Sequence, residues 1–193
     1  KFCKSFRVTM AILFFLIMAA LVMVFSGCKQ NKSHVRPGVL TVAQEQQSSW
    51  VRNFHPFLPM GVARWGTSAG IYEPLMIFNR MTGEYAPWLA TSYAWRGNAD
   101  ALIFTIREGV LWSDGEPFSA TDVVYTFNLI HKNPGLDTGG LWDYLSSVEL
   151  NEQGQVVLNF SRPYSPGLMS LAQLPIVPEH IWSKLEDPIT FTN

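Results

Sequence analysis

The sequence predicts a mixed α and β fold, and three observations support this prediction. Short runs rich in β-branched and aromatic residues, such as "ALIFTIREG" and "SSVELNEQGQVVLNF", are separated by turns that contain Gly, Asn or Asp. This is the pattern of antiparallel strands joined by hairpins. One segment, 119–132, carries the start and stop signals of an amphipathic helix. The 193 residues show no internal repeat and suffice for one domain with a hydrophobic core.

The first 28 residues predict an export signal. Three basic residues precede an apolar run from Val8 to Phe25, which is the arrangement of a secretory signal peptide. A run of about 18 apolar residues can also cross a bilayer, so an uncleaved membrane anchor is the alternative. "FSGC" at 25–28 resembles the lipobox of bacterial lipoproteins, although Phe25 stands where Leu, Val or Ile is usual. The resemblance implies that Cys28 is lipidated and that the exported part is held at the outer face of the cell membrane, since two acyl chains make a stable anchor.

The composition argues against several classes of function. Residues 29–193 hold 11 basic and 15 acidic side chains, a net charge of −4, so we expect no nucleic-acid partner. Cys3 lies in the signal and Cys28 is the predicted lipid site, so the exported part has no disulfide, CxxC motif or thiolate nucleophile. The sequence also has no Walker loop and no G-x-S-x-G elbow, and no cofactor is predicted.

The exported part is predicted to begin with a tether. Residues 29–38 are polar and rich in helix and strand breakers, which suits a linker between lipid and fold. "VLTVA" at 39–43 predicts a short buried strand. The segment 52–61 is predicted to be irregular, because Pro56 and Pro59 each lack an amide donor and restrict the preceding residue.

A hairpin and further strands are predicted next. The segment 67–79 can begin as a helix capped by Thr67 or Ser68, which Pro74 would end or kink, leaving "LMIFN" extended. "RMTGEY" then supplies the Gly-containing turn of a hairpin. Further strands are predicted in "LATSYAWRG", "ALIFTIREG" and "YLSSVELNEQGQVVLNF", with "NEQG" as the turn of a second hairpin.

The segment 113–135 predicts a turn followed by a helix with defined ends. "SDGEP" combines Asp, Gly and Pro, which favour turns. Ser119 as N-cap and Asp122 three residues later form a capping box. Apolar residues at i, i+4 and i+7 from Val123 predict the buried face, and "HKNPG" predicts the end. Beyond it, "LMSLAQLPIVPEHIW" predicts a short helix, a strand-like "PIV" and a helix that begins at Pro178.

Four carboxylates lie close together around this turn, on Glu108, Asp114, Glu116 and Asp122. A pair facing one pocket would suit glycosidic chemistry. Local structure already accounts for the two best candidates, because Asp114 belongs to the turn and Asp122 to the cap, which is worth about 1 kcal/mol to the helix. Glu108 and Glu116 flank turns, where water solvates them. We therefore predict no catalytic residue.

The histidines and tryptophans carry the remaining candidates. The four histidines are scattered, with no HxxxH or HExxH spacing, so no metal site is predicted. The simplest role for most of the seven tryptophans is core packing. Trp50 and Trp65 differ, because they flank the proline-rich segment, where exposed backbone commonly meets ligands. Aromatic rings there can stack on a sugar or pack on a peptide side chain. The predicted ligand-binding residues are Trp50, Asn53, Trp65 and Tyr72.

The stretch "FTIREGVLWSDGEPFSATDVVYTF" resembles the signature of the extracytoplasmic solute-binding proteins of family 5, the peptide/nickel/oligosaccharide-binding lipoproteins of ABC importers. Their pattern is roughly F-x-L-R-x-G-V-x-W-x-D-G-x-P-x-x-A-x-D-V-x-x-x-F, and Ile106 in place of Leu is the visible departure. "IYEPLMIFN", "APWLATSYAW" and "PIVPEHIW" match further blocks of this family in the same order. The resemblance covers the chain after the tether.

This resemblance implies a two-lobed fold of the periplasmic-binding-protein type II, with an extra β-rich subdomain, in a longer chain of which this is the N-terminal part. The implied organisation is a lipoprotein signal at 1–28, a tether at 29–38, a first segment of lobe I at 39–66, the β-rich subdomain with one capped helix at 67–170, and a truncated return into lobe I at 171–193.

The resemblance implies a binding protein that is not an enzyme. Such a protein closes over an oligomeric solute by a hinge motion and delivers it to ABC permease subunits. The tryptophan content, and "GEYAPWLATSYAW" in particular, favours a cello- or manno-oligosaccharide over an oligopeptide, and the lack of a histidine cluster disfavours nickel. Two alternatives remain: a surface-anchored hydrolase with its catalytic half downstream, and a receptor on the same fold that passes a peptide signal to a sensor.

Overall fold

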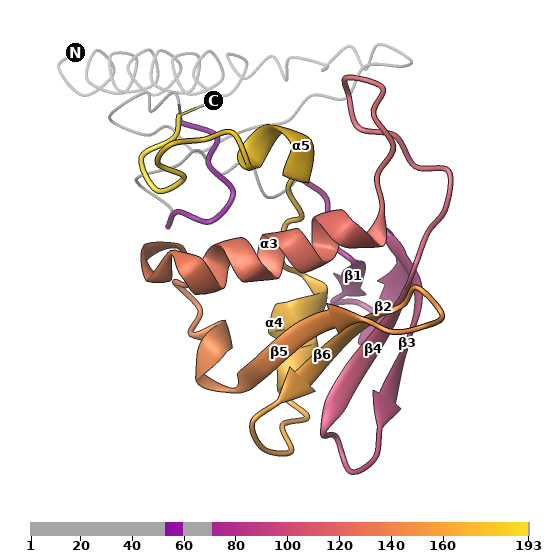
Figure 1. Cartoon of the computed structure of the whole chain (residues 1–193). Helices are drawn as coiled ribbons and strands as arrows, with labels where there is room; N and C mark the ends of the chain where they lie inside the picture. Colours follow the sequence, from indigo (N-terminus) through magenta and orange to yellow (C-terminus); the bar gives the residue numbers. More distant parts are fainter. Residues whose placement is uncertain (1–52, 60–70, 193) are drawn as a thin grey trace, which may run out of the picture. The chain divides into compact units, whose positions relative to one another are not determined.

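The computed structural model describes residues 53–59 and 71–192 (Figure 1). These residues fall within one unit of the chain, which spans 47–193. The predicted signal with Cys28, the tether, the strand at 39–43 and the helix start at 67–70 lie outside the described residues. Residues 53–59 contain no helix or strand, as the prolines in this segment predict. No helix among the described residues has the length and apolarity needed to cross a membrane.

An antiparallel sheet of four strands lies at the centre of the described part, in the order β3-β4-β6-β5. Its strands are β3 (Ala90–Arg96), β4 (Ala101–Ile106), β5 (Leu145–Leu150) and β6 (Val156–Phe160). Two hairpins build it, β3–β4 and β5–β6, and the central β4–β6 pair brings together strands that are far apart in the sequence. All four strands and the "NEQG" turn confirm the sequence prediction.

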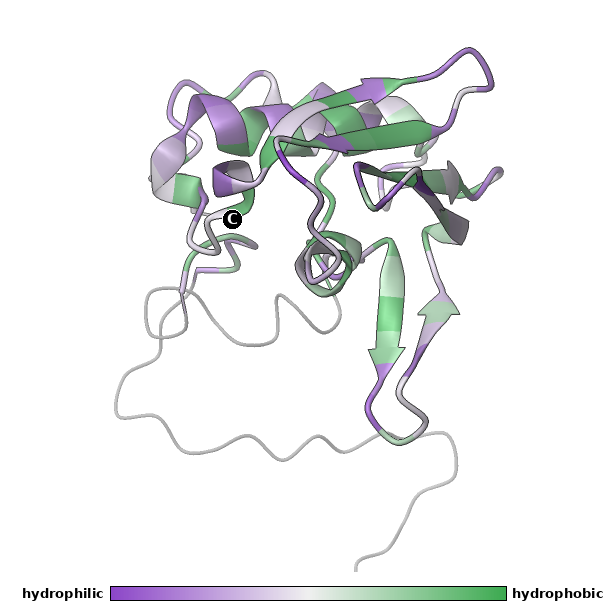
Figure 2. Ribbon diagram, turned by 90° about the horizontal axis from the view of Figure 1, so that it is seen from below, coloured by the Kyte–Doolittle hydropathy of each residue, from purple (hydrophilic) through white to green (hydrophobic). Residues whose placement is uncertain are grey.

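A separate hairpin of β1 (Met76–Asn79) and β2 (Glu84–Pro87) precedes this sheet. Figure 2 shows it projecting from the rest of the described chain, with hydrophobic residues in β1. The Asn79 side chain accepts a hydrogen bond from the backbone amide of Met81 (2.9 Å), and Gly83 has a φ of +75°, which favours glycine. The hairpin predicted around "RMTGEY" is therefore confirmed.

The helix α3 (Ala120–Lys132) packs on the sheet and buries Val123, Phe127 and Ile130, the three positions that its periodicity predicts. These side chains join one hydrophobic core with Phe104 of β4. The helix ends at Asn133, whose side-chain amide donates to the carbonyl of Leu129 (2.8 Å) and so satisfies one of the free carbonyls of the last turn.

The segment after α3 contributes to the central sheet and adds short helices on either side of it. It contains the 3₁₀ turns η1 (Pro134–Leu136) and η2 (Leu141–Asp143), the strands β5 and β6, and the short helices α4 (Gly167–Ala172) and α5 (Glu179–Trp182). In Figure 1, α5 lies above α3 and α4 lies behind the sheet. The predicted short helix at "LMSLA" is confirmed by α4.

In the predicted C-terminal part, the structure reduces the strand-like "PIV" to a single bridge and confirms a helix initiated by Pro178. "PIV" forms no strand; Pro175 makes a single bridge with Pro74, and the amide of Ile176 donates to the carbonyl of Glu73 (3.0 Å). Pro178 is the N-cap of α5, with extended backbone (φ −71°, ψ 119°). Its carbonyl accepts the backbone amides of Ile181 (3.2 Å) and Trp182 (3.0 Å), so the helix begins where the sequence predicts.

Candidate functional site

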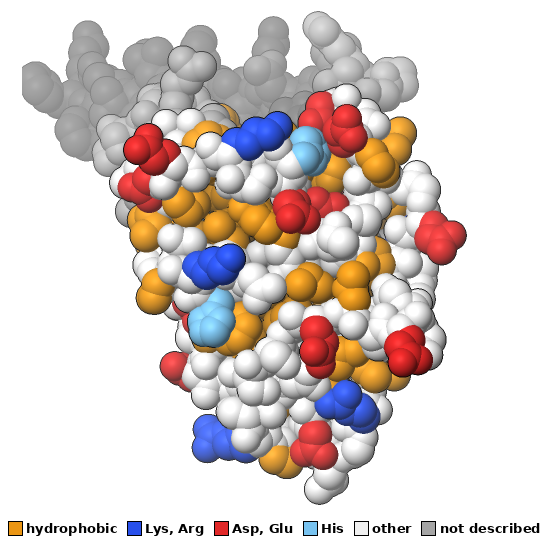
Figure 3. All heavy atoms as spheres, viewed as in Figure 1, with side chains coloured by type: hydrophobic (Ala, Val, Ile, Leu, Met, Phe, Trp, Pro, Cys, Tyr) orange, Lys and Arg blue, Asp and Glu red, His pale blue; other side chains and the backbone are white. Residues whose placement is uncertain are grey.

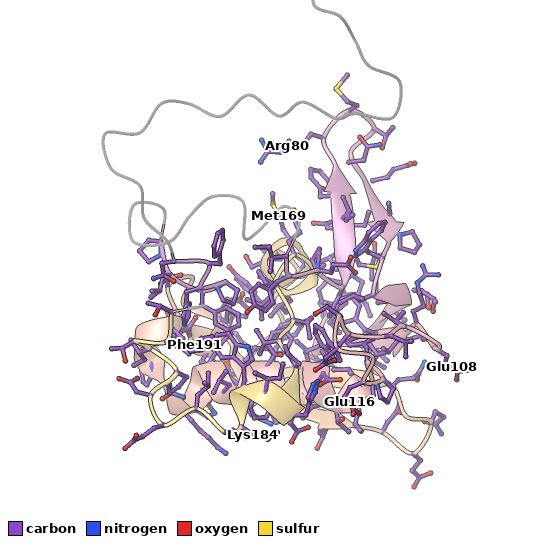
Figure 4. All side chains as sticks on the ribbon, turned by 90° about the horizontal axis from the view of Figure 1, so that it is seen from above. Arg80, Glu108, Glu116, Met169, Lys184 and Phe191 are labelled. Carbon is purple, nitrogen blue, oxygen red and sulfur yellow. The ribbon has the colours of Figure 1, made fainter. Side chains whose placement is uncertain are left out.

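The four carboxylates between 108 and 122 do not converge on one pocket. Asp114 accepts a hydrogen bond from the backbone amide of Glu116 (3.2 Å), across a turn in which Gly115 has a φ of +91°. Glu108 and Glu116 are exposed, and Figure 4 shows them at separate places on the periphery. The hydrogen bond from Glu116 to Asp114 and the positive φ of Gly115 confirm the predicted turn at 113–116.

Asp114 makes one further contact that the sequence pattern does not indicate. Its other carboxylate oxygen lies 2.7 Å from Nε2 of His180 in α5. The hydrogen bond from His180, followed by the one from the Glu116 amide, lowers the pKa of Asp114. The side chains of His180 and Asp114 are 32% and 41% exposed, so water screens the interaction and it adds little stability.

Asp122 is buried, with 4% of its surface exposed, and its two oxygens serve different helices. One oxygen accepts the backbone amide of Ser119 (2.9 Å), which is the cap that the S-x-x-D pattern predicts. The other accepts the backbone amide of Glu179 at the start of α5 (2.9 Å). Asp122 therefore has both oxygens occupied by the protein and none free for a reaction.

The described histidines do not form a metal centre. Across residues 53–59 and 71–192, no three or more His, Cys, Asp or Glu side chains are grouped so that they could hold a metal ion. His131 stacks on the indole of Trp142, with ring centroids 3.8 Å apart, and His180 pairs with Asp114. His55 is fully buried elsewhere.

An aromatic cluster surrounds Trp182, which is 2% exposed. Four rings contact it edge-on, with centroid distances of 5.3 Å for His55 and Phe191, 5.8 Å for Phe57 and 6.3 Å for Tyr72. We call these five residues the Trp182 cluster. Edge-to-face pairs at these separations add to the stabilisation from burial. The cluster joins three parts of the chain, which are residues 55–57, Tyr72 and residues 182–191.

His55 is held as a neutral ring inside this cluster. Its Nδ1 accepts the backbone amide of Phe57 (3.2 Å), so its Nε2 carries the hydrogen and donates to the carbonyl of Pro188 (2.8 Å). Burial lowers the pKa of His55, and the hydrogen bond to Pro188 only partly offsets this effect. A neutral His55 thus connects the segment 53–59 with the end of the chain.

Two of the four predicted ligand-binding residues, Trp50 and Trp65, lie outside the described residues. Asn53 is 8% exposed, and its side chain accepts the backbone amide of His55 (3.0 Å). Tyr72 is 9% exposed and belongs to the Trp182 cluster. Asn53 thus contacts the backbone of a cluster residue and Tyr72 belongs to the cluster, and both have little surface open to solvent. Their role in ligand binding stays a prediction.

Sequence reasoning missed His55 and Trp182 as residues that organise this region. A single histidine next to a proline has no spacing that would reveal its partners. Trp182 was one of several tryptophans assigned to core packing, and the structure confirms that role for Trp182 itself. Three others, Trp95, Trp112 and Trp142, are half-buried against the core, whereas Trp88 is 43% exposed.

A hollow of about 260 Å³ lies beside the cluster. It is lined by residues 56–58, by the segment 136–141 and by the end of α4 as far as Pro175. Its polar groups largely bind the protein itself: the two oxygens of Asp137 accept the amides of Leu141 (2.8 Å) and Trp142 (3.0 Å), and the Thr138 hydroxyl donates to the carbonyl of Phe57 (3.4 Å). Ligand pockets usually measure about 300–1,000 Å³. The hollow can thus hold one side chain or ring of a ligand, but not a whole oligomer.

The visible surface carries no concentrated charge. Figure 3 shows acidic side chains dispersed over one face, with basic side chains between them. Figure 4 shows Arg80 at the tip of the β1–β2 hairpin, well separated from Lys184 beside α5 and from Phe191.

Comparison with known families gives a match over more than half of the chain. The model described as "Bacterial extracellular solute-binding proteins, family 5 Middle" matches residues 84–193. This range includes the central sheet, α3 and the segment that returns through α5. It also contains the turn and capping box on which the sequence resemblance rests.

Individual proteins show the same similarity. The chain is 39% identical over 90 residues to "Protein XP55" of Streptomyces lividans, covering 46% of this chain and 16% of that protein. It is 35% identical over 103 residues to the nickel-binding periplasmic protein of Escherichia coli, covering 53% and 20%. A crystal structure of a periplasmic oligopeptide-binding protein from Thermotoga maritima with bound mannohexaose matches with a TM-score of 0.64 and 33% identity, covering 70% and 25%. The chain thus spans a quarter or less of the length of these three proteins.

Proposed function

Because the chain belongs to family 5 of the bacterial extracellular solute-binding proteins, we propose that it is part of the substrate-binding component of an ABC importer. In this role the complete protein captures its solute outside the cytoplasm and delivers it to permease subunits. The family match over residues 84–193 is the observation that carries the proposal.

The arrangement of the polar residues supports a binding role without chemistry. Asp114 and Asp122, the best candidates for catalytic acids, accept backbone amides. Glu108 and Glu116 are exposed and flank turns. A pair of acids for glycosidic chemistry would need both carboxyl groups at one pocket. Asp114 and Asp122 hold backbone amides in place instead.

We further propose that the solute is an oligosaccharide of the cello- or manno-type, with an oligopeptide as the alternative. The 33% identical protein from Thermotoga maritima was crystallised with mannohexaose, although its name is that of an oligopeptide-binding protein. The predicted ligand residues Trp50 and Trp65 flank the segment 53–59 in the sequence. That segment supplies Pro56–Leu58 to the hollow, whose apolar floor suits the face of a sugar ring or an apolar side chain.

The proposal is tested by titrating the complete gene product without residues 1–28. Tryptophan fluorescence would be followed during the addition of cello-oligosaccharides, manno-oligosaccharides, short peptides and Ni²⁺. We expect a saturable change with one of the two sugar series and none with peptides or Ni²⁺. Saturation by peptides alone would show that the solute is an oligopeptide and not an oligosaccharide. Saturation by Ni²⁺ alone would contradict both of these solutes.

Matched variants sharpen this test. Trp50→Ala and Trp65→Ala are expected to weaken binding by about tenfold or more, since stacking on an aromatic ring contributes roughly 1–3 kcal/mol. Trp88→Ala removes an exposed tryptophan of similar size outside the predicted site and serves as the control. Residues 29–193 alone are expected to bind weakly, because they present one side of the cleft. A micromolar dissociation constant for that fragment would contradict the proposal that the rest of the complete protein supplies the other side of the cleft.

A further inference from the structure

Two buried side chains of α3 hold the segment that leads into α5. Asp122 accepts the amide of Glu179 (2.9 Å), and the Thr126 hydroxyl accepts the amide of Val177 (3.1 Å). The same hydroxyl donates to the carbonyl of Asp122 (2.7 Å), which fixes its orientation. We call these contacts between Asp122, Thr126, Val177 and Glu179 the latch.

Asp122, Thr126 and Val177 of the latch are buried, whereas Glu179 is partly exposed. The hydrogen bond between Thr126 and Val177 is therefore difficult to replace by water. Thr126 is 0% exposed and Asp122 is 4% exposed, and Val177 is also 0% exposed. A buried amide that loses its acceptor cannot exchange it for water without opening the structure, so the full cost of desolvation remains. The contact between His180 and Asp114, one residue further along, is by contrast partly exposed.

The segment held by the latch has little stability of its own. The helix α5 contains four residues, far fewer than an isolated helix needs in water. Upstream, residues 175–176 are fixed by the bridge to Pro74 and one backbone hydrogen bond to Glu73. Downstream, α5 carries Trp182, the centre of the cluster that also contains His55. In Figure 1 this segment lies on the side of α3 that faces away from the sheet.

From this geometry we propose that Asp122 and Thr126 are positioning residues for α5, and that the latch can open while the sheet stays folded. Opening would release residues 177–182 from α3 and with them the Trp182 cluster, whereas β4 and β6 stay joined by their own antiparallel ladder. Proteins open locally in such units when a segment has few stabilising contacts apart from its attachment points. This proposal does not depend on the identity of the solute.

Hydrogen–deuterium exchange tests the latch in the complete gene product without residues 1–28. Thr126→Val keeps the shape of the side chain but removes the hydroxyl. We expect exchange in peptides that cover residues 174–184 to become about tenfold faster or more, since a buried amide then has no acceptor. Exchange in peptides from β4 and β6 is expected to stay unchanged.

Two control variants separate the latch from general destabilisation. Thr126→Ser keeps a hydroxyl at this position, so its exchange rate at 174–184 should stay within about threefold of the wild-type rate. Asp114→Asn weakens the exposed pair with His180 and should change exchange by less than about twofold. Equal acceleration in β4, β6 and 174–184 in the Thr126→Val variant would overturn the proposal. Unchanged exchange at 174–184 in that variant would overturn it as well.

Discussion

His55 illustrates how a buried polar side chain stabilises this protein. The ring accepts one backbone amide and donates to one backbone carbonyl, and it packs edge-on against Trp182. Each ring nitrogen has a partner only while the ring is neutral, because a protonated ring would place an N–H against the Phe57 amide. This arrangement couples the protonation of His55 to the folding of the region around the Trp182 cluster.

A pH dependence of stability follows from this arrangement. The folded protein lowers the pKa of His55, whereas the unfolded chain protonates it at the ordinary value of about 6.5. Below about pH 6.5 the unfolded state therefore binds more protons, and the free energy of unfolding falls until the lowered pKa of the folded state is reached. Urea unfolding of the chain from residue 29 onward, measured at pH 7.5, 6.5 and 5.5, should show this loss.

His55→Phe provides the comparison for that experiment. It keeps an aromatic ring in the cluster but removes both hydrogen bonds, so we expect it to be less stable than the wild type at pH 7.5 by about 1–2 kcal/mol. Its stability should depend less steeply on pH between 7.5 and 5.5. An identical pH dependence in the two proteins would show that His55 does not titrate in this range.

The hairpins show how single elements are encoded by their turns. In the turn between β5 and β6, the Asn151 side chain accepts the amides of Gln153 (3.1 Å) and Gln155 (2.8 Å). Gly154 has a φ of +72°, and a Cβ added there would meet no atom within 4 Å. Any cost of replacing Gly154 therefore comes from its backbone conformation and not from a clash.

Gly154 allows this conformational cost to be measured. Val is expected to destabilise the protein by roughly 1–2 kcal/mol, because a β-branched residue is poorly compatible with positive φ. Asn tolerates this conformation and should cost clearly less. Urea unfolding midpoints of Gly154→Val and Gly154→Asn, each compared with the wild type, check the difference. Equal losses for the two variants would contradict a backbone origin.

On the scale of the whole molecule, the chain corresponds to a small share of the length of its relatives. The chain spans 25% of the length of its relative from Thermotoga maritima, and the hollow beside the Trp182 cluster holds only about 260 Å³. The oligomer that we propose as the solute would need a cleft larger than this hollow. The predicted membrane anchor would keep the proposed binding protein close to its permease.

Anchoring through Cys28 is a prediction for the complete protein in its bacterial host. Cys28→Ala should abolish incorporation of labelled palmitate, because the lipid would be attached to that thiol. Cys3→Ala, in the segment that cleavage removes, should be lipidated like the wild type. Membrane fractionation completes the test: a Cys28→Ala protein that incorporates no lipid but stays in the membrane with residues 1–28 attached would support an uncleaved anchor instead.

The sequence alone determined the hairpins, the limits and buried face of α3, the turn at 113–116 and the family. These features depend on hydrogen bonds between residues at most four or five positions apart and on hydrophobic spacing, both of which are visible in a short window. The strand-like "PIV" segment forms only a single bridge, because strand pairing depends on which segment lies opposite in space.

Only the tertiary structure decided what the remaining polar atoms do. The second oxygen of Asp122 binds an amide 57 positions away, and Asp114 contacts a side chain 66 positions away. A capping carboxylate always has a second oxygen to satisfy, but its partner depends on where the chain returns in space. For the same reason, His55 and Trp182 became the centre of a cluster only once three separate parts of the chain had packed together.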